Sequence, residues 1–395
     1  MKKFFDRTFL LGLMAFLLAV PAALMLWSRH ETSAYYENRT LAAFPDVTLE
    51  ALWEGTLGSD LETWYSDHFP GRVTLLKADT ALQMDVLGRP VVNDMVVTEG
   101  VLLPKLDYSE YTAEAYRWTV QDFAEDFGAL NGYVGSLGGQ FLYVGFPEQR
   151  VYFEDLYPAY MNNHAAEAAV ADDIFAESLT AKGVDFMDMR QVYEAQGNPA
   201  EYYSIVDHHY NYYGAYAAYR AILDKLTDYG WALPVLTEAD VEFVELPNPY
   251  IGSRNRKLYN LWENEDKAIV LAEPPVTYTR YDNGQLSEKP LFVYPAEAHM
   301  PTTYNLYMGG DFAETVLETN RPELPDALIF GDSFSNALET LLYTAFDETH
   351  ILDLRHYKEQ SLQDYIAEYQ PDIVICIQND TFYYTKGGNS AVWED

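Results

Sequence analysis

The sequence is poor in cysteine and in basic residues, and both shortages narrow the range of functions. Among 395 residues there is one cysteine, Cys376, so an intrachain disulfide is excluded. Cys376 lies in the apolar run "DIVICI", where a buried and unreactive thiol is expected. Only 25 residues are lysine or arginine against 61 aspartates and glutamates, which gives a formal net charge of -36. This charge repels phosphate backbones and anionic lipid surfaces, so we expect no nucleic-acid partner.

Repeats and low-complexity tracts are also absent from the sequence. With 49% hydrophobic residues, a chain of this length can bury a sizeable core in one large domain or two modest ones. Cofactor-binding patterns are equally lacking, and we expect no cofactor.

The N-terminus carries the longest apolar run. Lys2, Lys3 and Arg7 precede residues 8–27, "TFLLGLMAFLLAVPAALMLW", a length that suits a membrane-spanning helix. We therefore expect residues 1–30 to form an uncleaved single-pass anchor in the cytoplasmic membrane, with the C-terminal domain extracytoplasmic. A cleaved signal peptide is the alternative, because residues 20–22 loosely fit a cleavage site.

The rest of the chain divides by its patterning. Residues 31–105 show short helical patterns broken by proline and glycine and predict a helical stalk or cap. From residue 106 to 395, helical patterns alternate with short apolar runs, which predicts a three-layer α/β/α sandwich with a parallel sheet. Residues 232–325 are rich in proline, tyrosine and alternating segments, and we expect a β-rich insertion or long loops there.

The run "LIFGDSFSNALETLL" predicts a strand, a tight turn and a helix, which places Ser333 at the carboxyl edge of the sheet beside a helix N-terminus. A serine nucleophile needs a base, and the base needs an orienting carboxylate. The stretch "YSIVDHHYNYYG" supplies both, because Asp207 and His209 are two apart in an extended segment and project to one side. His208 points the other way, and we expect a supporting role for it.

A third segment supplies a candidate for oxyanion stabilisation. "PDIVICIQND" predicts a buried strand that ends in polar residues at the same sheet edge as Ser333. The Asn379 amide is positioned there to donate to an oxyanion together with the Ser333 backbone N–H.

These motifs resemble a known family. "GDSF" followed by "PDIVICIQND" resembles the first and third sequence blocks of SGNH hydrolases. The Asp-x-His pair before the serine, the N-terminal apolar run, "ENRTLAAFP" and "DHFPGR" together resemble the DHHW family and the alginate O-acetyltransferase proteins of the AlgX and AlgJ type. The resemblance implies that Ser333 is the nucleophile and Asn379 the oxyanion asparagine, and Tyr210 stands at the position of the family's tryptophan. Two further candidates for an oxyanion or substrate contact are left undecided. One is the "HILDLRHY" segment, which contains Arg355, and the other is Gly310.

The resemblance implies a serine acetyltransferase that acts on a cell-envelope polysaccharide, with a multispanning membrane acyltransferase as the source of the acetyl group. An O-acetyl esterase with the same triad is one alternative. A non-catalytic glycan-binding or scaffold protein is another, and a separated triad would favour it. A metal site built on Asp207, His208 or His209 would need further ligands such as Glu297 or His299, and we expect none.

Overall fold

The computed structural model describes residues 2–27, 32–105, 113–161, 165–383 and 387–393. The chain forms two compact units: unit 1 comprises Met1–Asp94 and Arg256–Glu263, and unit 2 comprises Met95–Asn255 and Asn264–Asp395. The domain boundary predicted at residues 30–31 lies outside the described residues.

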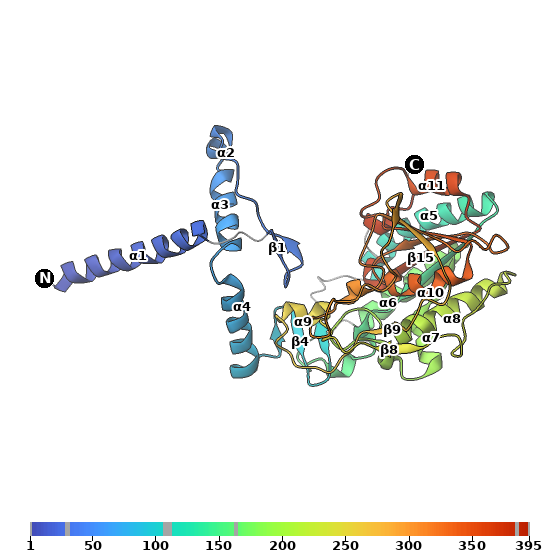
Figure 1. Ribbon diagram of the computed structural model, residues 1–395, viewed down its shortest axis with the longest axis horizontal. Coiled ribbons are helices and arrows are strands. Elements are labelled where there is room, and N and C mark those ends of the chain that lie inside the picture. The colour runs from blue at the N-terminus through green and yellow to red at the C-terminus, as the bar shows by residue number, and fades with distance from the viewer. Residues whose placement is uncertain (1, 28–31, 106–112, 162–164, 384–386, 394–395) are drawn as a thin grey trace. The chain divides into compact units, whose positions relative to one another are not determined.

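Unit 2 is organised around one large sheet (Figure 1). Within the described residues its eight strands are, in spatial order, β11 (Gln285–Ser287), β10 (Thr279–Asp282), β12 (Glu314–Glu318), β14 (Glu348–Leu352), β13 (Ala327–Gly331), β15 (Ile373–Asn379), β6 (Gln140–Phe146) and β7 (Asp185–Asp188). Shorter strands of the same unit are β4 (Met95–Val97), β5 (Leu102–Pro104), β8 (Phe243–Glu245) and β9 (Ile269–Leu271).

The strands predicted from apolar runs pair in parallel. β13 lies between β14 and β15, and β6 continues the parallel order to β7. The α/β class with a mostly parallel sheet is therefore confirmed. Strands from residues 232–325 extend this sheet instead of standing apart, because β12 pairs antiparallel with β14 and β10 with β12.

Helices cover both faces of the sheet. Figure 1 shows α5 and α11 on one side of β15, with α8 and α10 on the other. The helices of unit 2 are α5 (Ala113–Ser136), α6 (Ala165–Ala181), α7 (Met189–Gln196), α8 (Tyr212–Asp228), α10 (Ser335–Leu342) and α11 (Leu362–Tyr369), with α9 (Ser253–Lys257) crossing into unit 1. The second helical layer is held together by a hydrogen bond of 2.7 Å between the hydroxyls of Tyr212 in α8 and Thr340 in α10.

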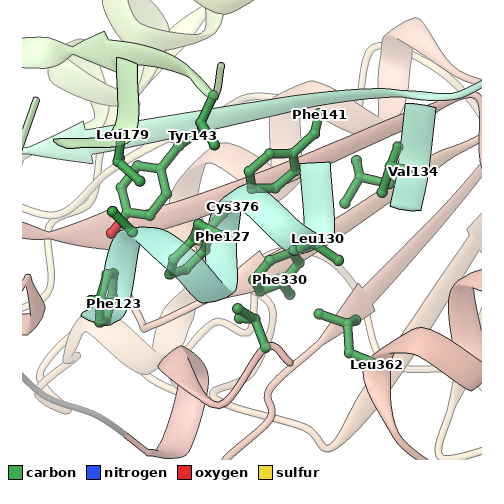
Figure 2. Packing of buried hydrophobic residues seen from close by; sticks show 14 of the residues in the cluster. Phe123, Phe127, Leu130, Val134, Phe141, Tyr143, Leu179, Phe330, Leu362 and Cys376 are labelled. Atoms are coloured by element: carbon green, nitrogen blue, oxygen red, sulfur yellow. The ribbon is translucent and has the colours of Figure 1, made fainter. Parts of the chain in front are cut away.

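The main core lies between α5, α6, α11 and the sheet. Figure 2 shows Phe127 of α5 facing Phe141 and Tyr143 of β6, and the Phe141 ring stacks on Phe330 of β13 with centroids 6.4 Å apart. Cys376 is buried in this core as a free thiol, as its apolar run predicts. The packed core fixes β13 and β15 side by side, so their carboxyl ends meet at one edge.

Unit 1 contains the N-terminal helices. Its elements are α1 (Lys2–Trp27), α2 (Leu49–Glu54), α3 (Thr56–Asp67), α4 (Arg72–Ala81), β1 (Ser33–Ala34), β2 (Arg39–Thr40) and β3 (Val91–Val92), and a π-helical turn over Leu82–Val86 continues α4. Residues 31–105 were predicted to be largely helical, and α2, α3 and α4 lie within them.

The predicted membrane anchor is corrected by the structure. A helix needs about 20 consecutive apolar residues to cross a bilayer core. In the part of the chain that the structure describes, no helix combines that length with sufficient apolar character. The prediction of a single-pass protein anchored in the cytoplasmic membrane is therefore wrong on this finding.

Candidate active site

Ser333 lies on the turn between β13 and α10. The Asp332 carboxylate fixes this turn, because it accepts hydrogen bonds from the Phe334 N–H at 2.8 Å and from the Asn379 N–H at 2.9 Å. The second bond ties the turn to the end of β15. Gly331 before the turn permits the close approach, because a Cβ there would lie 1.9 Å from the Ile377 carbonyl oxygen.

The predicted base and carboxylate reach Ser333. His209 Nε2 lies 2.8 Å from Ser333 Oγ, and His209 Nδ1 lies 2.6 Å from Asp207 Oδ1. Because Nδ1 faces a carboxylate, it donates its proton there, and Nε2 is left to accept the serine proton. One continuous chain of hydrogen bonds thus joins Asp207, His209 and Ser333, although Asp207 and Ser333 are 126 positions apart in the sequence.

Asp207 is held as an ionised acceptor. Its Oδ1 accepts the backbone N–H groups of His208 at 2.7 Å and His209 at 3.2 Å, and its Oδ2 accepts the Ser253 N–H at 2.6 Å. Burial raises the pKa of Asp207, but the nearby His209 ring and the hydrogen bonds outweigh it, and the net pKa lies well below its ordinary value. Asp207 is therefore a charged orienting group at neutral pH.

His209 is held as a neutral imidazole. Burial, reinforced by the neighbouring His208, lowers the pKa of His209 to about 4, although Asp207 opposes the shift. The ring stacks on Tyr304 with centroids 3.6 Å apart and an interplanar angle of 4°, and Phe334 packs beside it. These aromatic neighbours exclude water and fix the ring orientation, which suits a base that must be unprotonated to act.

His208 and Tyr210 lie beside the triad. His208 does not point away from Asp207 as expected, because its Nδ1 lies 3.2 Å from Asp207 Oδ1 and its ring centroid lies 3.8 Å from that of His209. The His208 side chain is 42% exposed, and its Nδ1 lies 2.7 Å from Ser253 Oγ. Tyr210 is buried, its hydroxyl donates to the Phe334 carbonyl oxygen, and its ring packs on Phe146. Tyr210 therefore stabilises the turn that carries Ser333 through its hydrogen bond to Phe334.

The candidate oxyanion donors differ in how they are engaged. Among the hydrogen bonds of the described residues, none uses the Ser333 N–H. The Asn379 side-chain oxygen accepts from Thr381, and its amide nitrogen makes one long contact of 3.4 Å to the Phe146 carbonyl oxygen. The Gly310 N–H donates to the Tyr307 carbonyl oxygen at 3.2 Å. The Asn379 amide is therefore the less engaged of the two candidate donors, and the Gly310 N–H is occupied by its own turn.

Arg355 lies in an ion-pair network near the site. It contacts Asp353 at 2.6 Å and Asp311 at 2.8 Å. The Asp311 carboxylate is near enough to His209 to raise its pKa, although burial lowers it more. The ion-pair network therefore lies beside the triad. A cavity of about 20 Å³, with room for a single water, adjoins Asp332 and Asp311.

Sequence reasoning missed three residues that build the site. Ser253 holds both Asp207 and His208, and Tyr304 covers His209, yet both lie in the interval predicted as an insertion. Gly252 lets this segment approach, because a Cβ there would lie 2.2 Å from the Val206 carbonyl oxygen. Glycine before a serine carries no local signal of this contact.

The same cluster has the composition of a metal site. Among the described residues, Asp207, His208 and His209 form the one group of three or more possible metal ligands whose ligand atoms all lie within 4.8 Å of one another. Glu297 and His299, the further ligands considered from the sequence, are exposed and pair with each other at 3.1 Å. Asp207 and His209 are already committed to each other and to Ser333, so the arrangement fits acyl chemistry better than metal binding.

A serine on a strand-to-helix turn, at the carboxyl edge of a parallel sheet and facing a histidine and an aspartate, is an arrangement typical of serine hydrolases and acyltransferases. Comparison with known families agrees: residues 116–261 match the family described as SGNH hydrolase-like domain, acetyltransferase AlgX. The matched stretch contains Asp207 and His209 and ends before Ser333. The resemblance predicted from the sequence is thereby confirmed, whereas a search of curated proteins found no match.

Solved structures show the same fold. PatB1 of Bacillus cereus superposes with a TM-score of 0.65 at 22% identity, over 76% of this chain and 99% of that protein. PatB1 carrying a sulfonyl adduct gives a TM-score of 0.64 at 20% identity, over 77% of this chain and 100% of that chain. A DHHW family protein from Eubacterium siraeum gives 0.53 at 19% identity, over 75% and 95% of the two chains.

Proposed function

We propose that this protein is a serine acyltransferase that moves an acetyl group through Ser333 onto a hydroxyl of a polysaccharide. The observation that carries the proposal is the unbroken hydrogen-bonded chain from Asp207 through His209 to Ser333, with spacings of 2.6 and 2.8 Å. The match of residues 116–261 to an acetyltransferase family supports the acetyl group as cargo. A separated triad would have favoured the scaffold alternative, and these distances give it no such support.

The reaction follows from the geometry. Ser333 Oγ attacks the acyl carbonyl carbon while its proton passes to His209 Nε2, and Asp207 stabilises the imidazolium that forms. The oxyanion accepts the Ser333 N–H and, in this proposal, the Asn379 amide. His209 then protonates the leaving group, and an acetyl ester remains on Ser333. A sugar hydroxyl then attacks the carbonyl carbon of this ester and gives its proton to His209 Nε2. The bond between Ser333 Oγ and the acyl carbon breaks, His209 returns the proton to Ser333 Oγ, and the acetylated sugar leaves.

The same residues perform hydrolysis when water replaces the sugar hydroxyl, so an O-acetyl esterase is the second candidate. The match of residues 116–261 to an acetyltransferase family favours transfer, whereas the covering of the His209 ring by Tyr304 and Phe334 acts equally on water and on a sugar hydroxyl. The multispanning membrane acyltransferase stays a prediction from the family resemblance, as the protein that supplies the acetyl donor.

The deciding experiment supplies an activated acetyl ester together with unmodified and pre-acetylated oligosaccharides, and follows the products by mass spectrometry. We expect acetyl gain on an acceptor with the intact protein and none with Ser333→Ala. Efficient stripping of acetylated glycans with no acceptor ever gaining acetyl would replace the transferase by the esterase. No turnover of the ester at all would overturn both.

A further inference from the structure

Two sequence motifs that the triad does not use meet in unit 1. "ENRTLAAFP" covers residues 37–45 and "DHFPGR" covers residues 67–72. The Arg39 guanidinium binds both oxygens of Asp67, at 2.9 and 2.5 Å, and the Ala42 N–H adds a bond of 2.8 Å. Arg39 and Arg72 both bond the Glu37 carboxylate. The motifs therefore form one ion-paired framework.

A cavity of about 470 Å³ opens beside this framework, within the size range of small-molecule sites. Its lining is formed by Ala34, Tyr35, Tyr36, Glu37, Leu41, Asp67, His68, Phe69, Pro70, Gly71, Arg72, Val73, Thr74 and Tyr259. All of these residues belong to unit 1. A purely stabilising role for the ion pairs of Arg39 and Arg72 would explain their contacts but would not explain the cavity beside them.

Aromatic rings form one side of the cavity. Tyr35 is 47% exposed and contacts the edge of Tyr36 with centroids 5.2 Å apart. Tyr36 packs against Tyr259 at 5.0 Å, and the Lys77 ammonium lies 4.6 Å from the Tyr36 centroid. The Arg256 guanidinium lies 6.0 Å from the Tyr35 centroid, and the half-exposed Tyr35 ring offers apolar surface beside polar groups, which suits a ligand that has the same two characters.

Charged groups form the other side, with both donors and acceptors. Arg72 is partly exposed, and its guanidinium makes one bond among those recorded for the described residues, the bond to Glu37. Hydrogen bonds from the arginines lower the pKa of Glu37 and of Asp67, so both carboxylates are ionised. An anionic ligand in the cavity would meet these carboxylates, and a cationic ligand would meet Arg72. A ligand rich in hydroxyl groups can donate to the first and accept from the second.

We propose that this cavity binds a neutral sugar unit, with the pyranose ring against Tyr35 and its hydroxyl groups on Arg72 and the Glu37 carboxylate. The net charge of -36 disfavours an acidic polymer in the same place. This site is separate from Ser333 and does not rest on the proposed reaction.

The test measures binding to the full-length chain by titration calorimetry. Its probes are the neutral tetrasaccharides of cellulose, chitin, starch and mannan, and the acidic tetrasaccharide of hyaluronan. We expect one neutral probe to bind, and to slow hydrogen exchange in residues 33–44 and 67–74. Tyr35→Ala and Arg72→Met should each weaken that binding by about tenfold or more. The Tyr35 ring is half exposed, so its loss should leave the unfolding temperature unchanged.

Matched controls separate this site from the rest of the molecule. Tyr160→Ala removes a tyrosine that is 73% exposed in unit 2, and Arg89→Met removes an exposed arginine of unit 1; both should bind as the parent does. Ser333→Ala should also bind normally, which distinguishes this proposal from the reaction. Failure of every neutral probe, tighter binding of the acidic probe, or full binding by Tyr35→Ala would each overturn the proposal. If Arg72→Met unfolds, the Tyr35 result decides.

Discussion

His209 joins the two halves of the proposed chemistry, because one ring nitrogen faces Asp207 and the other faces Ser333. Its pKa of about 4 means that the folded protein resists protonating it. The base is therefore available well below the ordinary histidine pKa of about 6.5. We expect kcat/KM for an activated acetyl ester to stay on its plateau down to about pH 5 and to fall through about pH 4.

The same shift predicts how stability depends on pH. Between about pH 6.5 and pH 4 the unfolded chain binds a proton at this histidine and the folded chain does not, so the free energy of unfolding falls as pH falls across that window. His209→Gln should lose this part of the dependence in chemical denaturation. An activity midpoint near pH 6.5 would show that His209 is not desolvated as the structure has it.

Substitutions at the triad test whether it acts as a unit. Ser333→Ala and His209→Ala should each lower kcat by about two or more orders of magnitude, and the double variant should lose little more, because either change alone breaks the same proton path. Steady-state kinetics with an activated acetyl ester measures both.

His208→Ala is the matched control for His209. Its ring contacts Ser253, Asp207 and the His209 ring but not Ser333, so its loss leaves the proton path from Ser333 to His209 in place and should reduce kcat far less. A His208 variant as inactive as the His209 variant would assign the base to the wrong histidine.

At the scale of elements, the triad depends on how closely the start of α9 approaches the Asp207 loop. Gly252 and Ser253 lie there, and the Ser253 N–H donates to Asp207. A Cβ at Gly252 would lie 2.6 Å from the Asp207 backbone nitrogen. The clash is between backbone segments, which cannot move apart as easily as a flexible side chain can. Gly252→Ala should therefore displace Asp207 and lower kcat by about tenfold or more, since small misplacements are costly.

Gly135→Ala is the control for this change. Gly135 lies in α5 with open space around the missing Cβ, so alanine there should leave kcat unchanged and raise helix stability slightly. Thermal unfolding of both variants separates a displaced site from a lost fold. Full activity of Gly252→Ala would mean that the approach of this segment does not hold Asp207.

At the scale of the whole molecule, the net charge of -36 acts on every approaching polymer. The Debye length falls from about 30 Å at 0.01 M salt to about 10 Å at 0.1 M, so repulsion of an acidic acceptor is strong at low salt and weak at high salt. We expect kcat/KM for an acidic polysaccharide acceptor to rise with salt over this range, while the value for a neutral acceptor changes little. An acidic acceptor that is used best at low salt would contradict this.

The sequence by itself determined the parallel strands of the central sheet, and it named the residues that we propose for the chemistry. Continuous apolar runs such as 372–377 mark buried parallel strands, and the strand-turn-helix around Ser333 places its hydroxyl at a sheet edge, because these are local properties of the chain. The two-residue spacing also predicts that Asp207 and His209 form a pair, but both His208 and His209 contact the Asp207 carboxylate, because this segment bends instead of running extended. The apolar N-terminal run predicted a membrane anchor, and this prediction is wrong, because no described helix is long and apolar enough to cross a membrane.

Only the tertiary structure decided the contacts between distant segments. The closing of His209 on Ser333 spans 124 positions, and the support of Asp207 by Ser253 spans 46. The joining of β10 and β12 to the central sheet and the meeting of Arg39 with Asp67 depend in the same way on packing. Local patterns are silent on such pairs, because a loop can return to many places and the packed core selects one.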